Sequence, residues 1–283
     1  METIGPLALK RNRLLKLLAG YGSCAVAFSG GIDSTVVAKA AQLALGSRAV
    51  AVTGVSGSLA EGELDDARRV AALIGIRHEV IHTDELANPA YVQNAPDRCY
   101  HCKTELYTQL DGLAERLGVA VVVNGANADD ALDYRPGMQA ASEHRVASPL
   151  LECELTKNDV RLLAAEWNLP TWDKPAMPCL SSRVAYGELV TPERLKMIDR
   201  AEQFLRANGL RELRVRYHKG DLARLEVPLA ELPRLCDESL RRQLVDELKA
   251  LGFKYVTLDL AGFRSGSLND LLPLVQLADA KNG

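Results

Sequence analysis

The segment Phe28-Ser-Gly-Gly-Ile-Asp-Ser34 has the composition of a loop that binds phosphate. It joins a short apolar run to a helical pattern. Gly30 and Gly31 lack Cβ atoms, so backbone N–H groups can close around an anion, and the following helix directs its free N–H groups and positive dipole end at the same point. Asp33 could hold a metal-bound water or cap the helix. The sequence lacks the Gly-Lys-Ser/Thr of kinase-type loops, so the pattern predicts another kind of nucleotide loop. The hydroxyl groups of Ser29 and Ser34 add two more polar groups to the loop.

Three of the six cysteines occupy positions that suit chemistry. Cys99 and Cys102 form a C-x-x-C pair before a helical pattern, which fits a redox dithiol, half of a zinc site or two ligands of an iron–sulfur cluster. A thioredoxin-type pair should follow the first strand of its fold, and a zinc site needs four ligands although no second C-x-x-C is present. Cys179 would be a third ligand, leaving one iron of a cluster open for chemistry. Ordinary thiols at a helix start are the simpler alternative.

The surroundings of Cys179 set it apart from the remaining cysteines. Pro178 precedes it, and Arg183, four residues later, would stabilise a thiolate or hold a phosphate. Cysteines in loops are otherwise more often structural. Cys24 and Cys236 fall within apolar patterns and are expected to be buried packing residues.

The segment Leu213-Arg-Val-Arg-Tyr-His218 alternates apolar and polar side chains, as a strand does. A three-residue turn at residues 219–221 would oppose apolar residues on one face and leave basic residues on the other. The predicted pairs are Arg214 with Glu226, Val215 with Leu225, and Arg216 with Arg224. Two arginines at this spacing suit the phosphate and carboxylates of an anionic substrate, although a solvated sheet face would look similar. Weaker candidates for substrate contact are Arg264, Glu202 and Glu226, and the two glutamates are equally suited to balancing arginines.

Alternating strands and helices must position these residues. Apolar runs predict strands at residues 24–28, 49–53, 77–82 and 119–124, and helical spacing predicts helices between them. This alternation is typical of an α/β, doubly wound parallel sheet, whose ligands bind beyond the carboxyl ends of the strands. The loops at residues 29–34 and 125–130 both fall there. A proline-rich link at residues 169–178 predicts two domains, at residues 1–180 and 181–283, the second a smaller α+β unit with a helix that starts at Thr191-Pro192.

The bulk composition excludes several classes of protein. The 283 residues are 47% hydrophobic and 25% charged, which is ordinary for a globular chain. The net charge of −3 disfavours a protein that mainly binds nucleic acid. No apolar run is long enough to span a membrane, and the basic, amphipathic N-terminal segment does not read as a signal peptide. Six scattered cysteines without an export signal favour reduced thiols or metal ligands over a disulfide framework, and we expect a cytoplasmic location.

The order of these motifs resembles the LarE family, the ATP-dependent sulfur transferases of nickel-pincer cofactor synthesis. The shared pieces span most of the chain: the Ser-Gly-Gly-x-Asp-Ser loop of ATP pyrophosphatases (PP-loop), the C-x-x-C pair, Gly125-Ala-Asn-Ala-Asp-Asp130, Pro178-Cys-Leu-Ser-Ser-Arg183, the Arg214 strand and Gly262-Phe-Arg-Ser-Gly-Ser267. The resemblance implies that ATP adenylates a carboxylate of a pyridinium-dicarboxylate mononucleotide, and that a protein-bound sulfur then displaces AMP. It also implies a PP-loop fold, Mg²⁺ to offset the pyrophosphate charge, and a homo-oligomer.

The resemblance further assigns residues to this reaction. It places ATP at the Ser29–Ser34 loop and implies further nucleotide contacts from Asn127, Arg135 and Arg183. Asp129 is either a second metal contact or a turn cap. The family has two sulfur sources: a single cysteine at the position of Cys179, which is sacrificed to dehydroalanine, or three cysteines that hold a [4Fe-4S] cluster with an extra sulfide. Because Cys99 and Cys102 accompany Cys179, the cluster is the favoured expectation and sacrifice of Cys179 the alternative. A PP-loop tRNA thiolation enzyme is the alternative function, and it would need a basic RNA-binding surface.

Overall fold

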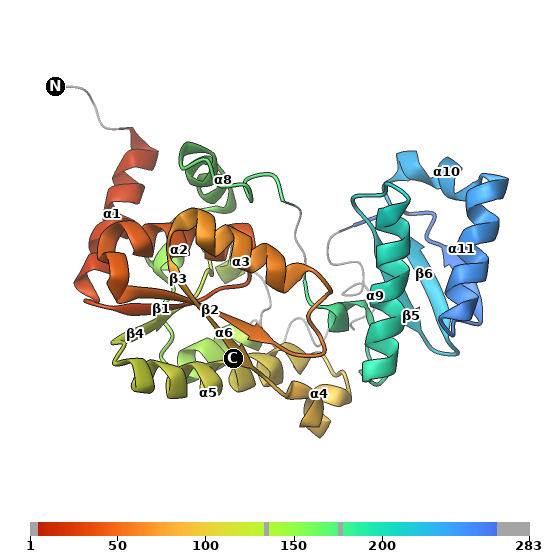
Figure 1. Cartoon of the computed structure of the whole chain (residues 1–283), viewed down its shortest axis with the longest axis horizontal. Coiled ribbons are helices and arrows are strands. Elements are labelled where there is room, and N and C mark those ends of the chain that lie inside the picture. The colour runs from red at the N-terminus through yellow and green to blue at the C-terminus, as the bar shows by residue number, and fades with distance from the viewer. Residues whose placement is uncertain (1–4, 133–135, 175–177, 265–283) are drawn as a thin grey trace. The chain divides into compact units, whose positions relative to one another are not determined.

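The computed structural model describes residues 5–132, 136–174 and 178–264 (Figure 1). The chain divides into two compact units. The first comprises Met1–Ser56, Gly62–Glu85 and Cys99–Met177, and the second comprises Gly57–Glu61, Leu86–Arg98 and Pro178–Gly283. Two short segments from the N-terminal half therefore belong to the second unit, a feature that no pattern in the sequence indicates.

The first unit is a parallel four-stranded sheet with helices on both faces, so the predicted α/β class is confirmed (Figure 1). The strand order is β3-β2-β1-β4, and all three neighbouring pairs are parallel. Its strands are β1 (Cys24–Ala27), β2 (Ala49–Val55), β3 (Arg77–His82) and β4 (Val121–Val123), and its helices are α1 (Pro6–Gly20), α2 (Ile32–Leu45), α3 (Glu63–Ile74), α5 (Arg98–Leu117), α6 (Pro136–Glu143), α7 (Pro149–Glu152) and α8 (Lys157–Glu166).

Each face of this sheet has its own apolar core, because successive strand side chains point to opposite sides. Cys24 and Val26 of β1 pack in a core with residues of α1, α2, α3 and α8. Ala25, between them, packs in a second core with residues of α5 and α6, such as Leu110. Burial on both faces explains why these strands read as continuous apolar runs. The sheet thus holds the loops at its carboxyl ends on a rigid base.

The second unit is a smaller α+β structure around a three-stranded sheet in the order β5-β6-β7. The first two strands are an antiparallel hairpin, and β7 is parallel to β6. The register pairs Arg214 with Glu226 and Arg216 with Arg224, which confirms the predicted hairpin. Its elements are α4 (Pro89–Val92), a 3-10 helix at Leu180–Arg183, α9 (Pro192–Ala207), β5 (Arg214–His218), β6 (Leu222–Glu226), α10 (Leu232–Cys236), α11 (Glu238–Ala250) and β7 (Tyr255–Leu258).

Capping residues begin two helices, and the start at Thr191-Pro192 is where the sequence predicted it. Thr156 caps α8, with the Thr156 side chain bonded to the Asp159 N–H and the Asp159 side chain bonded back to the Thr156 N–H. Thr191 caps α9, with Pro192 in its first turn. The expectation that Cys236 is buried is wrong, because this residue ends the short helix α10 and is exposed. Within the described part of the chain, no helix is long and apolar enough to cross a membrane.

Candidate active site

The loop between β1 and α2 is held in shape by its own hydroxyl groups. The Ser29 N–H donates to Ser34 Oγ at 3.2 Å, and the Gly31 N–H donates to Ser29 Oγ at 3.3 Å. Ser34 Oγ donates to the Gly31 carbonyl at 3.1 Å. Gly31 is the N-cap of α2 and supplies no side-chain cap, so the first N–H groups of the helix are not capped by it. A loop at the carboxyl end of a parallel strand that leads into such a helix start fits an anionic phosphate group.

At two positions in this region the neighbouring backbone lies so close that only glycine fits without a shift. Gly30 has φ +69°, and a Cβ there would lie 3.3 Å from Ala67 Cα of α3. A Cβ on Gly125, in the loop after β4, would lie only 2.7 Å from the Ser34 backbone nitrogen. The backbone of residues 125–130 therefore packs directly against the start of α2. The two loops that the sequence predicted to share the carboxyl edge of the sheet do lie together.

Asp33 lies between these loops and is bound from two sides. Its Oδ1 accepts from Asn127 Nδ2 at 3.1 Å, and its Oδ2 forms an ion pair with Lys157 Nζ at 2.5 Å. Asn127 is buried, and its Oδ1 in turn accepts from the Asp129 N–H. The Asp33 side chain keeps 25% of its surface exposed and Lys157 keeps 34%, so a bound ligand can reach both. A carboxylate beside a phosphate loop fits Mg²⁺, whose preferred ligands are oxygen atoms.

Sequence reasoning missed two features of this site. Lys157 is distant in sequence from Asp33, and its only signal is its place just after the N-cap of α8, where its N–H donates to Asp129. Thr53 of β2 donates to the Phe28 carbonyl at 2.8 Å, and its oxygen also contacts His78 Nε2 at 2.8 Å. Burial, followed by the charge of Arg68, lowers the pKa of His78. This buried chain supports the backbone one residue before the phosphate loop.

The six cysteines differ sharply in their environments, and no disulfide joins any of them. Burial raises the pKa of Cys24 to about 12 and also raises the pKa of Cys153, so both are poor nucleophiles at neutral pH. Cys99 is exposed, and Cys102 and Cys179 are half-buried. Cys99 and Cys102 lie in the first turns of α5, in the first unit, whereas Cys179 belongs to the second. In residues 5–132, 136–174 and 178–264, no three His, Cys, Asp or Glu side chains form a metal site, and the three cysteines are divided between the two units, so the cluster stays a prediction.

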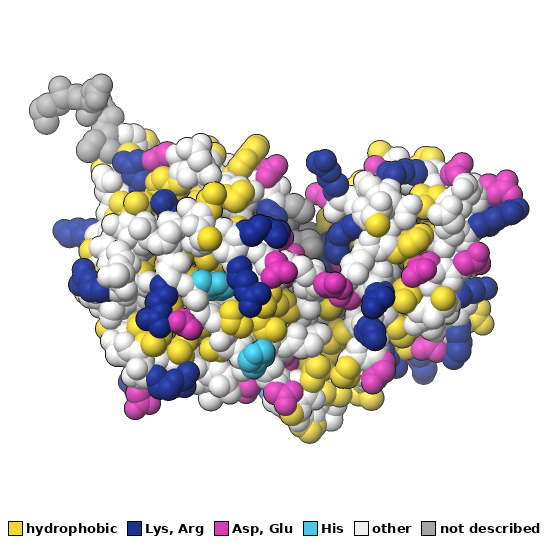
Figure 2. All heavy atoms as spheres, viewed as in Figure 1, with side chains coloured by type: hydrophobic (Ala, Val, Ile, Leu, Met, Phe, Trp, Pro, Cys, Tyr) yellow, Lys and Arg dark blue, Asp and Glu magenta, His cyan; other side chains and the backbone are white. Residues whose placement is uncertain are grey.

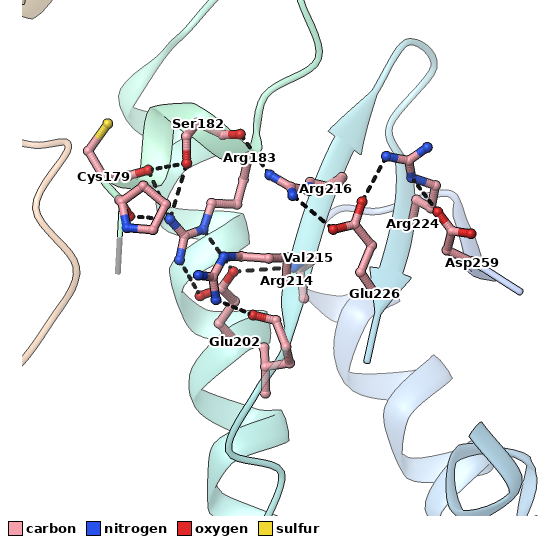
Figure 3. A network of polar contacts seen from close by, with 12 residues as sticks. Cys179, Ser182, Arg183, Glu202, Arg214, Val215, Arg216, Arg224, Glu226 and Asp259 are labelled. Carbon is pink, nitrogen blue, oxygen red and sulfur yellow. Dashed lines mark hydrogen bonds and ion pairs between the residues drawn. The ribbon is translucent and has the colours of Figure 1, made fainter. Parts of the chain in front are cut away.

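Cys179 is held through its backbone (Figure 3). It is the N-cap of the 3-10 helix, and its carbonyl accepts from the Ser182 N–H, from Ser182 Oγ at 2.8 Å and from Arg183 Nη1 at 3.0 Å. Arg183 also donates to the Pro178 carbonyl. The Sγ atom points away from these contacts (Figure 3). The loop therefore fixes the main chain of Cys179 and leaves its thiol accessible.

Arg183 is fully buried and forms a paired ion contact with Glu202 of α9. Its Nε and Nη2 donate to the two carboxylate oxygens at 3.0 and 3.2 Å. Glu202 also accepts from the Val215 N–H of β5 and from Arg206. Burial alone would raise the pKa of Glu202. The positive charges of Arg183 and Arg206 outweigh this effect, so the pKa of Glu202 is lowered. In this structure Arg183 positions Cys179, and its predicted phosphate contact stays a prediction.

The predicted cationic face of the hairpin is present, and it is nearly buried. Arg214 and Arg216 are 5% and 6% exposed. Arg216 binds the Ser182 carbonyl at 2.9 Å and Glu226 at 2.8 Å, and Glu226 also pairs with Arg224 (Figure 3). Burial, together with the charge of Arg183, lowers the pKa of Arg214 to about 10, so it stays charged at neutral pH. Ser182 thus joins the Cys179 loop to this face.

Two more residues were predicted to contact ligands. Arg264 is exposed, beside Phe263, whose ring faces the Arg214 guanidinium at 5.1 Å. Arg135 lies outside the described residues. Charges of both signs are interspersed on the face drawn in Figure 2, over the first unit and over the second.

Sequence comparisons show which known proteins this chain resembles. The sequence model of the Asparagine synthase family matches residues 17–173. An uncharacterised protein of Synechocystis is 46% identical over 266 residues, covering 94% of this chain and 99% of that protein. The pyridinium-3,5-bisthiocarboxylic acid mononucleotide synthase of Lactiplantibacillus plantarum is 40% identical over 275 residues, covering 96% of this chain and 98% of that enzyme. A tRNA-specific 2-thiouridylase of Azorhizobium caulinodans is 31% identical over 210 residues, which cover 60% of this chain and 53% of that enzyme.

Proposed function

The chain belongs to the LarE family of ATP-dependent sulfur transferases, and we propose that it converts the carboxylates of pyridinium-3,5-biscarboxylate mononucleotide to thiocarboxylates for nickel-pincer cofactor synthesis. The family assignment rests on the match to the Lactiplantibacillus plantarum synthase along nearly the whole chain. The observation that carries the proposal is the loop of Cys179, which holds an accessible thiol on a backbone fixed by Arg183. Synthetases that use ammonia on an adenylate would not need such a thiol.

The first unit supplies the activating step. An ionised carboxylate is a poor electrophile, so the substrate carboxylate attacks the α-phosphorus of ATP and pyrophosphate leaves. Backbone N–H groups of Gly30, Gly31 and the start of α2 would bind the departing pyrophosphate. Mg²⁺ would lie at Asp33 and offset its charge. Lys157, released from its ion pair with Asp33, would then contact the phosphates.

The second unit supplies the sulfur. The thiolate of Cys179 attacks the acyl-adenylate carbon, the bond to AMP breaks, and a thioester joins the substrate to Cys179. Loss of the Cα proton and cleavage of the Cβ–Sγ bond then release the thiocarboxylate and leave dehydroalanine at position 179. The protein mass falls by one H₂S for each sulfur transferred, and no external oxidant or reductant is needed.

A cluster held by Cys99, Cys102 and Cys179 is the other sulfur source that the family resemblance implies. The described residues give it no assembled ligand set, so it is supported only by the presence of the three thiols in the sequence. Both routes use Cys179, and they differ in whether the C-x-x-C pair is required.

The buried arginines of the hairpin would recognise the substrate. Its phosphate and two carboxylates are anionic, and Arg214 and Arg216 are rigid guanidinium groups near the Cys179 loop. Glu226 binds Arg216, and Glu202, which binds Arg183 and the Val215 N–H, places its negative charge near Arg214. Arg264 is a further candidate for substrate contact. The resemblance also implies a homo-oligomer in the cytoplasm, which light scattering of the purified protein and localisation of a tagged chain would test.

One set of reactions tests the proposal. The protein is purified without oxygen, its iron and acid-labile sulfide are measured, and ATP and the pyridinium substrate are added. We expect pyrophosphate, thiocarboxylate and, without iron, a mass loss of one H₂S. Cys179→Ser should still release pyrophosphate but form no thiocarboxylate. The double variant Cys99→Ser/Cys102→Ser separates the sources: it keeps the transfer if Cys179 is sacrificed and loses it if a cluster is the donor.

The alternative, tRNA thiolation, is weighed in the same assay. The tRNA-specific relative covers only part of this chain, and the net charge is −3. If the pyridinium substrate gave no pyrophosphate while unmodified tRNA gave both pyrophosphate and thiolated base, the proposed substrate would be wrong.

A further inference from the structure

The segment Leu86–Arg98 belongs to the second unit although its neighbours on both sides belong to the first. It contains α4 and ends at Arg98, the residue before Cys99. Its contacts are concentrated on the loop of Cys179: the Val190 N–H donates to the Val92 carbonyl at 2.9 Å, and the Gly187 N–H to the Asn94 carbonyl at 3.3 Å. The segment therefore runs along the loop after Cys179, in which Leu180, Ser181 and Val190 are buried.

Tyr91 and Arg98 both bind Ser181, two residues after Cys179. The Tyr91 hydroxyl and Ser181 Oγ lie 2.5 Å apart, and Arg98 Nη1 donates to the Ser181 carbonyl at 2.7 Å. Tyr91 and Ser181 have no exposed surface, and Arg98 has 5%. Removing one partner of a buried hydrogen bond is costly, because the other polar group then stays buried without a hydrogen bond and without water.

Asn94 fixes the next part of the same loop. It is fully buried with φ +57°, a left-handed conformation that asparagine tolerates better than most residues. Its Nδ2 donates to three carbonyls, those of Val184, Ala185 and Glu188, at 3.2, 2.8 and 3.0 Å. Its Oδ1 accepts from Arg98. One amide thus joins the segment to three backbone carbonyls of the loop.

A second short segment adds another restraint. The Leu180 N–H, directly after Cys179, donates to the Ser58 carbonyl at 2.9 Å, and Ser58 belongs to Gly57–Glu61. Two sets of contacts therefore hold the Cys179 loop. Arg183, paired with Glu202, binds the carbonyls of Pro178 and Cys179, and the segments Gly57–Glu61 and Leu86–Arg98 bind Leu180 and Ser181. None of these contacts involves the Cys179 thiol.

We propose that Tyr91, Asn94 and Arg98 are positioning residues for sulfur transfer, which hold the Cys179 main chain so that its sulfur meets the acyl-adenylate. This inference rests on the proposed function. We expect the three residues to act on the sulfur step and not on adenylation, because they donate to or contact residues 181–188 and none of them belongs to the phosphate loop. Loss of these contacts lets the main chain of Cys179, a half-buried residue, move, so that small reagents alkylate its thiol faster while sulfur transfer becomes slower.

The variant Tyr91→Phe tests the proposal with the least change of shape. It removes the hydroxyl that faces Ser181 and keeps the ring. We expect pyrophosphate release in the first turnover to stay at the wild-type rate and thiocarboxylate formation to fall about tenfold, which corresponds to about 1.4 kcal/mol. In the same protein, without ATP or substrate, iodoacetamide should alkylate the Cys179 peptide several-fold faster, as followed by mass spectrometry.

Tyr21→Phe is the matched control, since it removes an exposed tyrosine hydroxyl bonded to Glu152, after the end of α1 in the first unit. It should leave the rates of pyrophosphate release, thiocarboxylate formation and Cys179 alkylation unchanged. Ser181→Ala removes the other partner of the Tyr91 contact, and the double variant should be no slower in sulfur transfer than either single variant. If Tyr91→Phe lowers protein yield, Ser181→Ala gives the same test.

The outcomes separate this inference from the proposed function. If the wild-type protein forms no thiocarboxylate, the proposed function fails. The alkylation rates alone then decide whether Tyr91, Asn94 and Arg98 position Cys179. If Tyr91→Phe and Ser181→Ala both alkylate at the wild-type rate, or if pyrophosphate release and sulfur transfer fall by equal factors, the positioning role is overturned.

Discussion

The contact of Gly125 with the start of α2 makes a quantitative prediction. In Gly125→Ala, the new Cβ would lie 2.7 Å from the Ser34 nitrogen, 3.0 Å from the Asp33 carbonyl carbon and 3.1 Å from Ser34 Cα. All three are backbone atoms, so no side chain can rotate away. The shortest contact is about 0.7 Å short of ordinary van der Waals separation, and such overpacking costs roughly 1–3 kcal/mol.

The relief of this clash must move either the phosphate loop or the loop of Asn127. Misplacement of reacting groups by about 1 Å lowers rates by on the order of 10²-fold. We therefore expect Gly125→Ala to release pyrophosphate on the order of 10²-fold more slowly and to bind ATP more weakly. Single-turnover pyrophosphate assays and isothermal titration with ATP measure these changes.

Gly20→Ala is the matched control for this change. Gly20 ends α1, and a Cβ there meets nothing within 4 Å. It should keep wild-type ATP affinity, and its stability should be unchanged or slightly higher because alanine favours a helix. If Gly125→Ala also bound ATP and released pyrophosphate like the wild type, the close packing of the two loops would not determine the nucleotide site.

Three further predictions concern charge and capping. Lys157→Met should weaken ATP binding about tenfold, since a hydrogen bond to a charged group contributes roughly 1.5 kcal/mol, and unchanged affinity in titration would argue against a phosphate contact. Glu202→Gln should destabilise the protein by about 3 kcal/mol in thermal unfolding, because it leaves buried Arg183 poorly compensated. The pKa of Glu202 is lowered in the folded state, so its stabilising contribution is present above the ordinary glutamate pKa and is lost as pH falls through the lowered value. Glu202→Gln should therefore lose less stability than the wild type in that acidic range. Parallel curves of unfolding free energy against pH for the two proteins would contradict this. Thr156→Ala should cost about 1 kcal/mol through the lost cap of α8, whereas Thr108→Ala, on the surface of α5, should be nearly neutral in the same melt.

Features that depend on neighbours in sequence were predictable. The glycine loop, the helix that follows it and the cap at Thr156 each depend on a few consecutive residues. The register of the β5–β6 hairpin followed from side-chain alternation and the length of its turn, because a shift by one residue would have turned apolar Val215 outward. The parallel sheet followed from apolar runs separated by helical patterns.

Features that depend on distant partners were not predictable. Lys157 meets Asp33 across 124 residues, and Tyr91 meets Ser181 across 90. Nothing in the composition of Leu86–Arg98 shows that it belongs to the second unit, since its prolines and polar residues fit any loop. Cys236 was misplaced for a related reason: the apolar spacing around it is that of a helix, but α10 spans only five residues and ends there.

This contrast bears on how the two reaction steps can be separated by mutation. The nucleotide site is built from backbone groups and glycines close in sequence, so its defects should be severe and should appear first in pyrophosphate release. The main chain beside Cys179 is held by side chains from α4 and the start of α5, and by Glu202 of α9 through Arg183. Single substitutions among these residues should slow sulfur transfer in graded steps, because each removes one of several restraints on the same short loop.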